Sequence, residues 1–256
     1  MADMPVIERG SPVSSMVIPL WCRAQCRVLY PQLGVGEDDA ETVSRLRADF
    51  TAARQSEPLL YALRQDMLAS RLEAYLASHP RAVLIDLGCG LDTLLRRVDN
   101  GCCRRIYADL PEAMALREKL LPAREREEYV AADALGLPRF EGIDPAEGVY
   151  IVMSGLSCHL TLDENCALIS ALARTFPGAR VGFDALGAPA RLFSSSMGIR
   201  SYLPRSGAVE RWEGVSGLEA FTRLPEKYAC LPRAKRLRLA ALLALGVLRV
   251  CELRLA

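Results

Sequence analysis

The spacing of hydrophobic and polar residues along this chain changes at about residue 81. Between residues 58 and 78, apolar side chains recur every three to five positions, which predicts a helix with one buried face. This helix should end at His79-Pro80, because a residue before proline avoids the helical conformation. Residues 37–50 predict another helix, with acids at its start where they suit the helix dipole. We therefore expect residues 1–80 to form a helical N-terminal segment.

After residue 81, short apolar runs alternate with amphipathic stretches, which is typical of an α/β fold. Strands are predicted at 82–87, 104–108, 128–132, 149–153 and 179–186, and helices at 91–98, 111–121 and 161–176. The first run, AVLIDL, is apolar on both faces, as in a covered parallel sheet. The helix at 161–176 opens with a T-x-x-E capping box. A last strand within 244–256 is expected beside 219–225, antiparallel in an otherwise mostly parallel sheet.

The length and charge of the chain restrict its domain organisation and the kinds of partner that it can bind. The 256 residues suffice for one sizeable core, so we expect a cap (1–80) and a core (81–256) in a single folding unit. Lys and Arg number 32 against 31 Asp and Glu, which argues against a nucleic-acid partner. The longest apolar run, 239–248, has about half the length that spans a bilayer, and we interpret it as a buried helix running into a strand. The start of the chain lacks a secretory pattern, so we expect a cytoplasmic protein with no membrane and no obligatory protein partner.

The nine cysteines are scattered without a C-x-x-C pair, and only two histidines are present. An odd count in a chain of this size argues against a disulfide framework. We expect reduced, mostly buried thiols and no metal site. The basic stretch 232–238 is interpreted as a solvated helix face.

Glycines and acids stand where three successive predicted strands end. Gly88 and Gly90 follow the first strand, Asp109 the second and Asp133 the third. Glycine lets backbone amides approach a ligand closely, and ligands of such sheets bind beyond the carboxyl ends of the strands. Asp109 could accept both hydroxyls of a ribose, and Asp133 could accept a hydrogen bond from the adenine amine. The sequence therefore predicts a site for an adenosine-containing ligand.

Two classes of ligand fit this prediction, a nicotinamide dinucleotide and S-adenosylmethionine. Dinucleotide sites need a third glycine that lets the helix pack close to the pyrophosphate, and here Thr93 or Leu94 holds that place. S-adenosylmethionine carries no phosphate and needs no such cradle. It is therefore the favoured cofactor, and an NAD-dependent oxidoreductase is the weaker alternative.

Three motifs make the pattern more specific: LGCGLDTLLRRVDNG, IYADLPEAMALREKLLP and FPGARVGFDA. Together they resemble the leucine carboxyl methyltransferase family, above all its bacterial branch of polyketide O-methyltransferases. The resemblance begins at residues 18–24 and thins after about residue 190. It implies a Rossmann-like class I methyltransferase sheet and S-adenosylmethionine as the methyl donor.

The resemblance also implies roles for single residues. Gly88 would lie against the methionine portion of the donor and Asp109 would hold its ribose. Asp133 and Ala134 would flank the adenine. Arg64 matches the family arginine that pairs with the donor carboxylate, a role that suits a guanidinium fork.

Two positions depart from the family pattern after the fourth strand. Ser154 stands where a glutamate would meet the amino end of the donor, and it could accept one hydrogen bond without supplying charge. His159 stands where the family has a tyrosine. Its imidazole could take a proton from an acceptor hydroxyl, or it could be a structural histidine.

The leading hypothesis is an S-adenosylmethionine-dependent O-methyltransferase that acts on a hydroxyl or carboxylate of a small molecule such as a polyketide. One alternative is a donor-binding or scaffolding protein of the same fold that has lost activity, and another is carboxyl methylation of a protein or peptide C-terminus. The acceptor pocket is expected between the N-terminal helices and residues 186–212. Tyr202 and Trp212 could line it, or could simply pack in the core.

Overall fold

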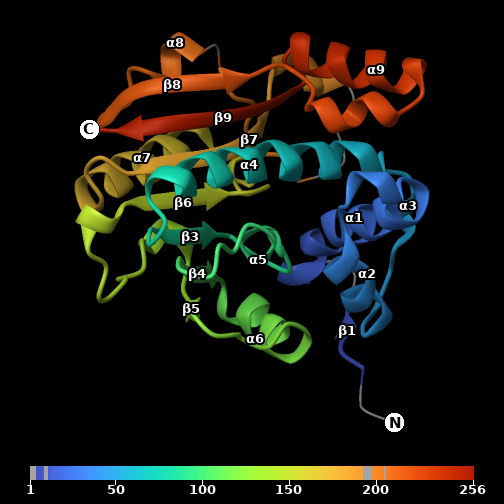
Figure 1. Ribbon diagram of the computed structural model, residues 1–256, viewed down its shortest axis with the longest axis horizontal. Coiled ribbons are helices and arrows are strands. Elements are labelled where there is room, and N and C mark those ends of the chain that lie inside the picture. The colour runs from blue at the N-terminus through green and yellow to red at the C-terminus, as the bar shows by residue number, and fades with distance from the viewer. Residues whose placement is uncertain (1–3, 9–10, 193–197, 205) are drawn as a thin grey trace.

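A computed structural model describes residues 4–8, 11–192, 198–204 and 206–256 of the chain. Within these residues the centre is a seven-stranded sheet in the order β5-β4-β3-β6-β7-β9-β8 (Figure 1). Its strands are β3 (Val83–Leu87), β4 (Arg104–Asp109), β5 (Glu127–Ala131), β6 (Val149–Met153), β7 (Arg180–Leu186), β8 (Val215–Phe221) and β9 (Leu248–Leu255). Strands β3 to β7 pair in parallel, and β9 runs antiparallel to both of its neighbours. The predicted α/β fold with a mostly parallel sheet and an antiparallel last strand is confirmed.

Helices precede the sheet and alternate with its strands. The N-terminal segment holds α1 (Val17–Leu29), α2 (Glu37–Ser44), α3 (Thr51–Arg54) and α4 (Pro58–Ser78), and the later helices are α5 (Leu94–Arg97), α6 (Pro111–Leu120), α7 (Leu162–Thr175), α8 (Ser206–Val209) and α9 (Arg233–Ala244). Short 3-10 turns are η1 (Pro12–Met16), η2 (Pro31–Leu33), η3 (Ala134–Gly136), η4 (Pro145–Glu147), η5 (Ser157–His159), η6 (Ala188–Leu192) and η7 (Glu226–Cys230). A small parallel pair joins β1 (Val6–Ile7) to β2 (Arg47–Ala48).

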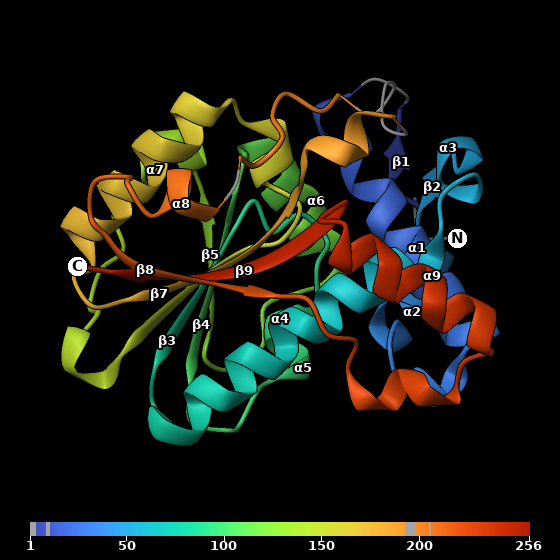
Figure 2. The same ribbon diagram turned by 90° about the horizontal axis from the view of Figure 1, so that it is seen from above.

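The sheet is covered on both faces, which explains why its strands are apolar throughout. Alternate residues point to opposite faces, so Leu84 and Tyr150 pack with α4, α5 and α9, whereas Ile85 and Ile151 pack with α7. Figure 2 shows α4 and α7 on opposite sides of the sheet. A third apolar cluster joins α1 to α6 through Leu20 and Leu120.

Helices α1 and α2 lie at the carboxyl ends of the parallel strands, whereas α4 lies along one face of the sheet. In Figure 1 the arrowheads of β3 and β6 point toward α1 and α2. Met16 and Arg23, from the start of this segment, approach Gly90 and Asp92 directly after β3. The segment therefore covers the edge of the sheet at which the sequence predicts a ligand.

The predicted bounds of several helices and strands are confirmed, and those of others are wrong. Helix α4 and strand β6 have the predicted bounds, and the capping box of Thr161 and Glu164 is formed. The helix predicted over 37–50 ends at Ser44, and that over 91–98 is shortened to α5 because residues 91–93 continue the bend after β3. The strand predicted at 219–225 is wrong in its bounds, since β8 runs four residues earlier along β9.

The apolar run 239–248 is a helix leading into β9, as predicted, but only one face of that helix is buried. Leu239 and Leu243 lie in the core, whereas Leu245 is 68% exposed. No helix in the described ranges is long and apolar enough to cross a membrane. The nine cysteines are free thiols, five of them buried.

Candidate functional site

The bend after β3 requires its two glycines. Gly88 and Gly90 have φ values of +67° and +46°, in the left-handed region that favours glycine. A Cβ at Gly88 would lie 3.0 Å from Cδ1 of Leu156, and one at Gly90 would lie 3.2 Å from Cε of Met16. The Gly88 amide donates to the Ala108 carbonyl over 2.8 Å, which ties the bend to the end of β4.

Asp109 lies against this bend. The amides of Gly90 and Leu110 each donate to one of its carboxylate oxygens over 2.7 Å. Burial raises the pKa of Asp109, and the two amides oppose that rise. A carboxylate has about four acceptor positions, so about two remain for a ligand. The predicted meeting of Gly90 and Asp109 is thus present in the structure.

The end of β5 lies beside Asp109, because the Ala132 amide donates to the Asp109 carbonyl over 2.9 Å. Asp133 is exposed, and its carboxylate caps η3 by accepting from the Leu135 amide over 3.0 Å. Ala134 follows it, half-buried. The structure therefore brings the three predicted strand ends together on one edge of the sheet.

Ser154 and Arg64 lie on either side of Gly155, just after β6. The buried Ser154 hydroxyl donates to Oδ2 of Asp92 over 3.3 Å. Arg64 donates from Nη1 to Oδ2 of Asp184 over 3.2 Å, and the Gly155 amide donates to the other oxygen of that carboxylate over 2.6 Å. The Arg64 Nε is buried without a hydrogen-bond partner.

A buried group of charges, which we call the strand-end charge cluster, was not predicted. It consists of Arg23, Arg64, Asp39, Asp92 and Asp184. Arg23 joins two carboxylates, with 2.7 Å to Asp39 and 3.3 Å to Asp92. Its members come from α1, α2, α4, the β3 bend and β7, so no local pattern links them.

Hydrogen bonds hold Asp92 at the centre of this cluster. Its Oδ1 accepts from Gln65 Nε2 and from the Leu94 amide, each over 2.8 Å. Burial acts to raise the pKa of Asp92, but Arg23 and the hydrogen bonds outweigh it and hold that pKa below its usual value. For Asp39, burial outweighs Arg23 and its pKa is raised.

Two further buried ionisable groups, Arg117 and Asp86, belong to this region, and Arg117 contacts the bend directly. Arg117 donates from Nη1 to the carbonyls of Gly90 and Asp92 over 2.9 Å, and its guanidinium lies 3.9 Å from the centre of the Tyr107 ring. Asp86, on β3, is fully buried and neither of its carboxyl oxygens has a hydrogen-bond partner. Burial raises the pKa of Asp86 well above its usual value.

His159 lies in η5, half-buried, with Nδ1 3.4 Å from the carbonyl oxygen of Gly198. Within the described residues its ring makes no hydrogen bond to Arg64, Asp109 or Ser154. Its predicted catalytic role stays a prediction.

The expected acceptor region, 186–212, is described except for residues 193–197 and 205, which lie outside the described residues. Trp212 packs against the core between the sheet and α7. The Arg191 guanidinium lies 5.0 Å from the centre of the Tyr202 ring.

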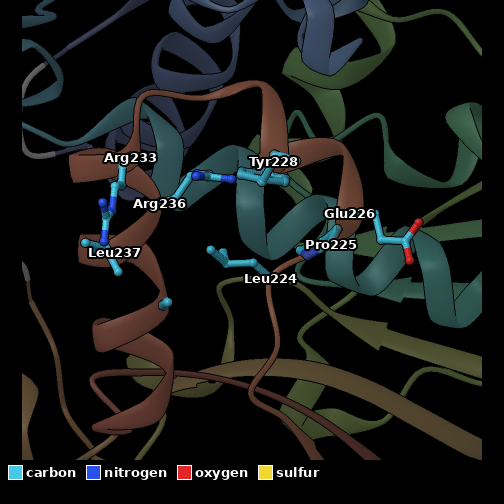
Figure 3. A pocket seen from close by; sticks show the side chains of 9 residues that line it. Leu224, Pro225, Glu226, Tyr228, Arg233, Arg236 and Leu237 are labelled. Atoms are coloured by element: carbon cyan, nitrogen blue, oxygen red, sulfur yellow. The ribbon is translucent and has the colours of Figure 1, made fainter.

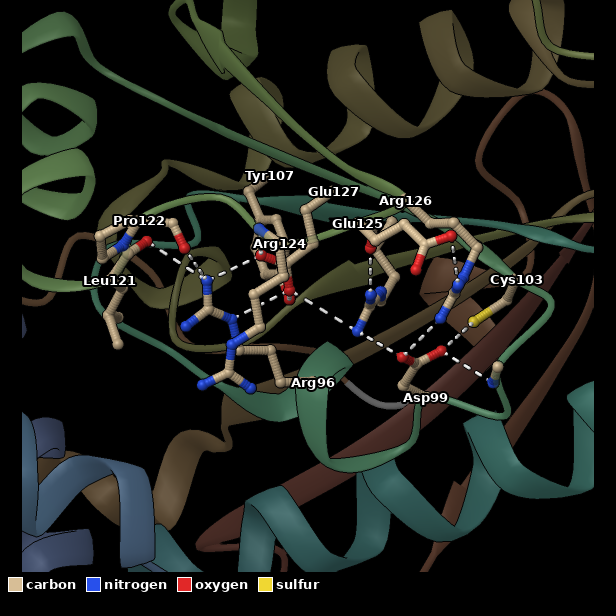
Figure 4. Close-up of polar contacts among 12 residues, drawn as sticks. Arg96, Asp99, Cys103, Tyr107, Leu121, Pro122, Arg124, Glu125, Arg126 and Glu127 are labelled. Carbon is tan, nitrogen blue, oxygen red and sulfur yellow. Dashed lines mark hydrogen bonds and ion pairs between the residues drawn. The ribbon is translucent and has the colours of Figure 1, made fainter.

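Two other features lie away from the strand ends. A pocket of about 330 Å³ opens between η7 and α9, lined by Tyr228, Arg233 and Arg236 among others (Figure 3). A network of ion pairs holds the opposite, amino ends of β4 and β5, with 2.7 Å between Arg96 and Glu127 (Figure 4). Neither contains a predicted site residue.

Comparisons with known proteins concern the fold that carries these residues. Over 160 residues the chain is 26% identical to the tetracenomycin polyketide synthesis O-methyltransferase TcmP of Streptomyces glaucescens, and the match spans 61% of this chain and 59% of that protein. The structure of the N-methyltransferase NodS from Bradyrhizobium japonicum WM9 has a TM-score of 0.50 at 15% identity, over 75% of this chain and 96% of NodS. The structure of the mitomycin 7-O-methyltransferase MmcR has a TM-score of 0.53 at 14% identity, over 93% of this chain and 60% of MmcR.

No family model matches the chain, so membership of the leucine carboxyl methyltransferase family stays a prediction. At these identities the solved structures show the fold alone. In this chain β9 is inserted antiparallel between β7 and β8. The chain has the Rossmann-like fold of class I methyltransferases.

Proposed function

We propose that this protein is an S-adenosylmethionine-dependent methyltransferase that methylates an oxygen atom, hydroxyl or carboxylate, of a small molecule. The observation that carries the proposal is the contact between the Gly90 amide and Asp109, at the carboxyl ends of the central strands of a methyltransferase fold. The sequence relation to an O-methyltransferase of polyketide synthesis supports oxygen as the acceptor atom and a polyketide-like molecule as the acceptor.

The residues at this edge suit each part of the donor. Asp109 keeps acceptor positions for the two ribose hydroxyls, and Asp133 and Ala134 would flank the adenine. A Cβ at Gly88 would press on the Leu156 side chain, so only glycine lets the bend lie this close to Leu156. Arg64, whose Nε lacks a partner, would hold the donor carboxylate.

When bound, the donor supplies a methyl group on a sulfonium centre, which is transferred by in-line displacement. The protein contributes mainly by holding the acceptor oxygen, methyl carbon and sulfur in line, which can lower a barrier by about 7–11 kcal/mol. A general base typically adds about 10²–10⁴-fold in rate. A carboxylate acceptor is already ionised near pH 7 and needs no base, whereas a phenol, with a pKa of about 10, would gain from His159.

The remaining predictions complete this proposal. The N-terminal segment, residues 1–80, would cap the site of the 81–256 core in a single folding unit. The acceptor would bind between that cap and residues 186–212. We place the reaction in the cytoplasm, on a diffusible small molecule, without an obligatory protein partner.

Isothermal titration with S-adenosylmethionine tests the donor site. We expect binding by the native protein and a loss of more than about tenfold in Asp109→Ala, because the ribose would lose a charged acceptor. Asp144→Ala is the matched control, since the exposed Asp144 likewise accepts from the backbone, at the Ala146 amide of η4. Absence of binding by the native protein at millimolar donor would refute the proposal.

A donor-binding protein without transferase activity is the second candidate. The side chains of Leu156 and Met16 lie against the bend, and Ser154 stands where the family resemblance predicts a glutamate. Incubation with donor and a panel of phenols and carboxylic acids, followed by mass spectrometry, separates the two candidates. A product heavier by one methylene group eliminates the second, and its lability to alkali distinguishes an ester from an ether.

A further inference from the structure

The strand-end charge cluster is not electrically balanced. It holds two arginines, Arg23 and Arg64, against three aspartates, Asp39, Asp92 and Asp184. Each aspartate lies within hydrogen-bond or ion-pair distance of an arginine. All five side chains are buried or nearly so. By formal charge, two cations against three carboxylates leave the cluster with one net negative charge.

The other charged groups at this edge do not cancel that charge. Arg117 and Asp109 carry one charge of each sign. Asp86 is fully buried without a hydrogen-bond partner, and such burial disfavours its ionised form. Asp133 is exposed, so solvent screens it.

Another group of charges lies on a different side of α4. Asp66 pairs there with Arg97 and Lys227, whose side chains are 28% and 34% exposed. Water reaches both of these cations and weakens their influence on the strand ends. The cluster keeps its excess of negative charge in the part of the edge that water does not reach.

This charge lies next to the residues that would hold the donor. The Ser154 hydroxyl donates to Asp92, so a carboxylate lies directly behind the serine that would meet the amino end of the donor. Asp184 accepts from both Arg64 and the Gly155 amide. Ser154 stands where the family resemblance predicts a glutamate. The carboxylates of Asp92 and Asp184 therefore supply near this position the charge that serine lacks.

The donor and its product differ by one unit of charge. S-adenosylmethionine carries a carboxylate, an ammonium and a sulfonium group, which leaves one net positive charge. In transfer, the S–CH3 bond breaks and its electron pair stays on sulfur, while a lone pair of the acceptor oxygen forms the new O–CH3 bond. The product, S-adenosylhomocysteine, is therefore neutral overall.

We propose that the strand-end charge cluster selects the cationic methyl donor over its neutral product and so favours product release. The inference rests on the proposed donor site. A buried net charge is costly, and a ligand of opposite charge relieves that cost, whereas a neutral ligand does not. One unit charge acting over about 10 Å at an effective dielectric constant of about 20 changes affinity on the order of tenfold.

Isothermal titration of the native protein with three ligands tests the proposal. The ligands are S-adenosylmethionine, S-adenosylhomocysteine and sinefungin, an analogue with an amine in place of the sulfonium centre and one net positive charge. We expect the two cationic ligands to bind on the order of tenfold more tightly than S-adenosylhomocysteine. Agreement between sinefungin and the donor would show that charge, not the methyl group, is recognised.

Asp39→Asn removes the excess charge at a residue that lies behind Arg23, away from Ser154 and Arg64. The amide oxygen can still accept from Arg23, so we expect a folded variant whose preference for the cationic ligands falls by about tenfold. Glu213→Gln is the control: it changes the net charge of the protein equally, at an exposed ion pair with Arg174. We expect no change of preference there.

The outcomes separate this inference from the proposed function. If none of the ligands binds, the donor site itself is wrong. If S-adenosylhomocysteine binds to the native protein as tightly as the donor or more tightly, the donor site stands and the charge selection is overturned. An unchanged preference in folded Asp39→Asn also overturns it, and the comparison within the native protein decides the matter if that variant does not fold.

Discussion

Replacing Arg23 tests how the N-terminal segment is held to the sheet. Arg23 is 1% exposed and lies between Asp39 of α2 and Asp92 of the β3 bend. Arg23→Met keeps most of the apolar stem and removes the guanidinium. Two buried carboxylates then lose their cation, and breaking a buried ion pair in this way typically costs about 3–5 kcal/mol. For a chain of this length that corresponds to a fall in Tm of about 6–20 °C.

The loss of stability in Arg23→Met should be larger at high pH than at low pH. Without Arg23, the pKa of Asp39, already raised by burial, rises further, and Asp92 loses the cation that opposes the effect of its burial. The folded variant then binds more protons than the unfolded chain above the unfolded pKa of about 3.9. Its stability falls as pH rises through the folded pKa values, so the deficit relative to the native protein should shrink between pH 7.5 and pH 5.

Urea unfolding followed by circular dichroism at both pH values measures this deficit. Arg174→Met is the matched control, because the ion pair of Arg174 with Glu213 is exposed and such pairs contribute about 0–1 kcal/mol. The double variant Arg23→Met/Asp39→Leu removes one of the stranded carboxylates and should recover part of the loss. If Arg23→Met costs no more than the control at pH 7.5, the buried bridge does not hold the segment as we describe.

Two substitutions near the bend test its backbone and its buried acid. Gly88→Ala should cost about 1–2 kcal/mol for the left-handed backbone and also weaken donor binding through the contact with Leu156, whereas Gly101→Ala, with φ +79° and open space around it, should show only the backbone cost. Thermal unfolding and titration calorimetry measure both, and equal donor affinity in the two variants would contradict the account. Asp86→Asn removes a group whose folded pKa is raised well above its unfolded value and which therefore lowers stability as pH rises. The decline of unfolding free energy between pH 5 and pH 8 should become shallower in this variant, and an unchanged slope would count against a neutral Asp86.

The parts of the fold that could be predicted are those whose hydrophobic pattern is strong. Helix α4 and strand β6 have the predicted bounds, because one carries a long apolar face and the other is buried at all five positions. The predicted position of strand β8 was wrong by four residues. None of the residues of β8 is buried, and only its pairing with β9 determines where it lies. The alternation along such an edge strand gives little indication of register.

The same distinction applies to the candidate site. Gly88, Gly90 and Asp109 could be predicted as neighbours because the carboxyl ends of parallel strands meet at one edge of a sheet. Arg23 and Asp39 could not, since the contact from Arg23 to Asp92 joins residues 69 positions apart. An arginine within an amphipathic helix ordinarily indicates a solvated face, and here tertiary structure places it in the interior.

Stability alone does not account for the strand-end charge cluster. Replacing a buried ion pair by well-packed apolar residues is often neutral or stabilising, so two arginines and three aspartates are a costly way to join a helical cap to a sheet. A purely structural cluster would also reach its lowest cost with equal numbers of the two charges. One carboxylate of the cluster, Asp92, accepts from Ser154, the residue that stands where the family resemblance predicts a glutamate. An excess of carboxylates is what the proposed selection of a cationic ligand would require, and packing alone gives no reason for it.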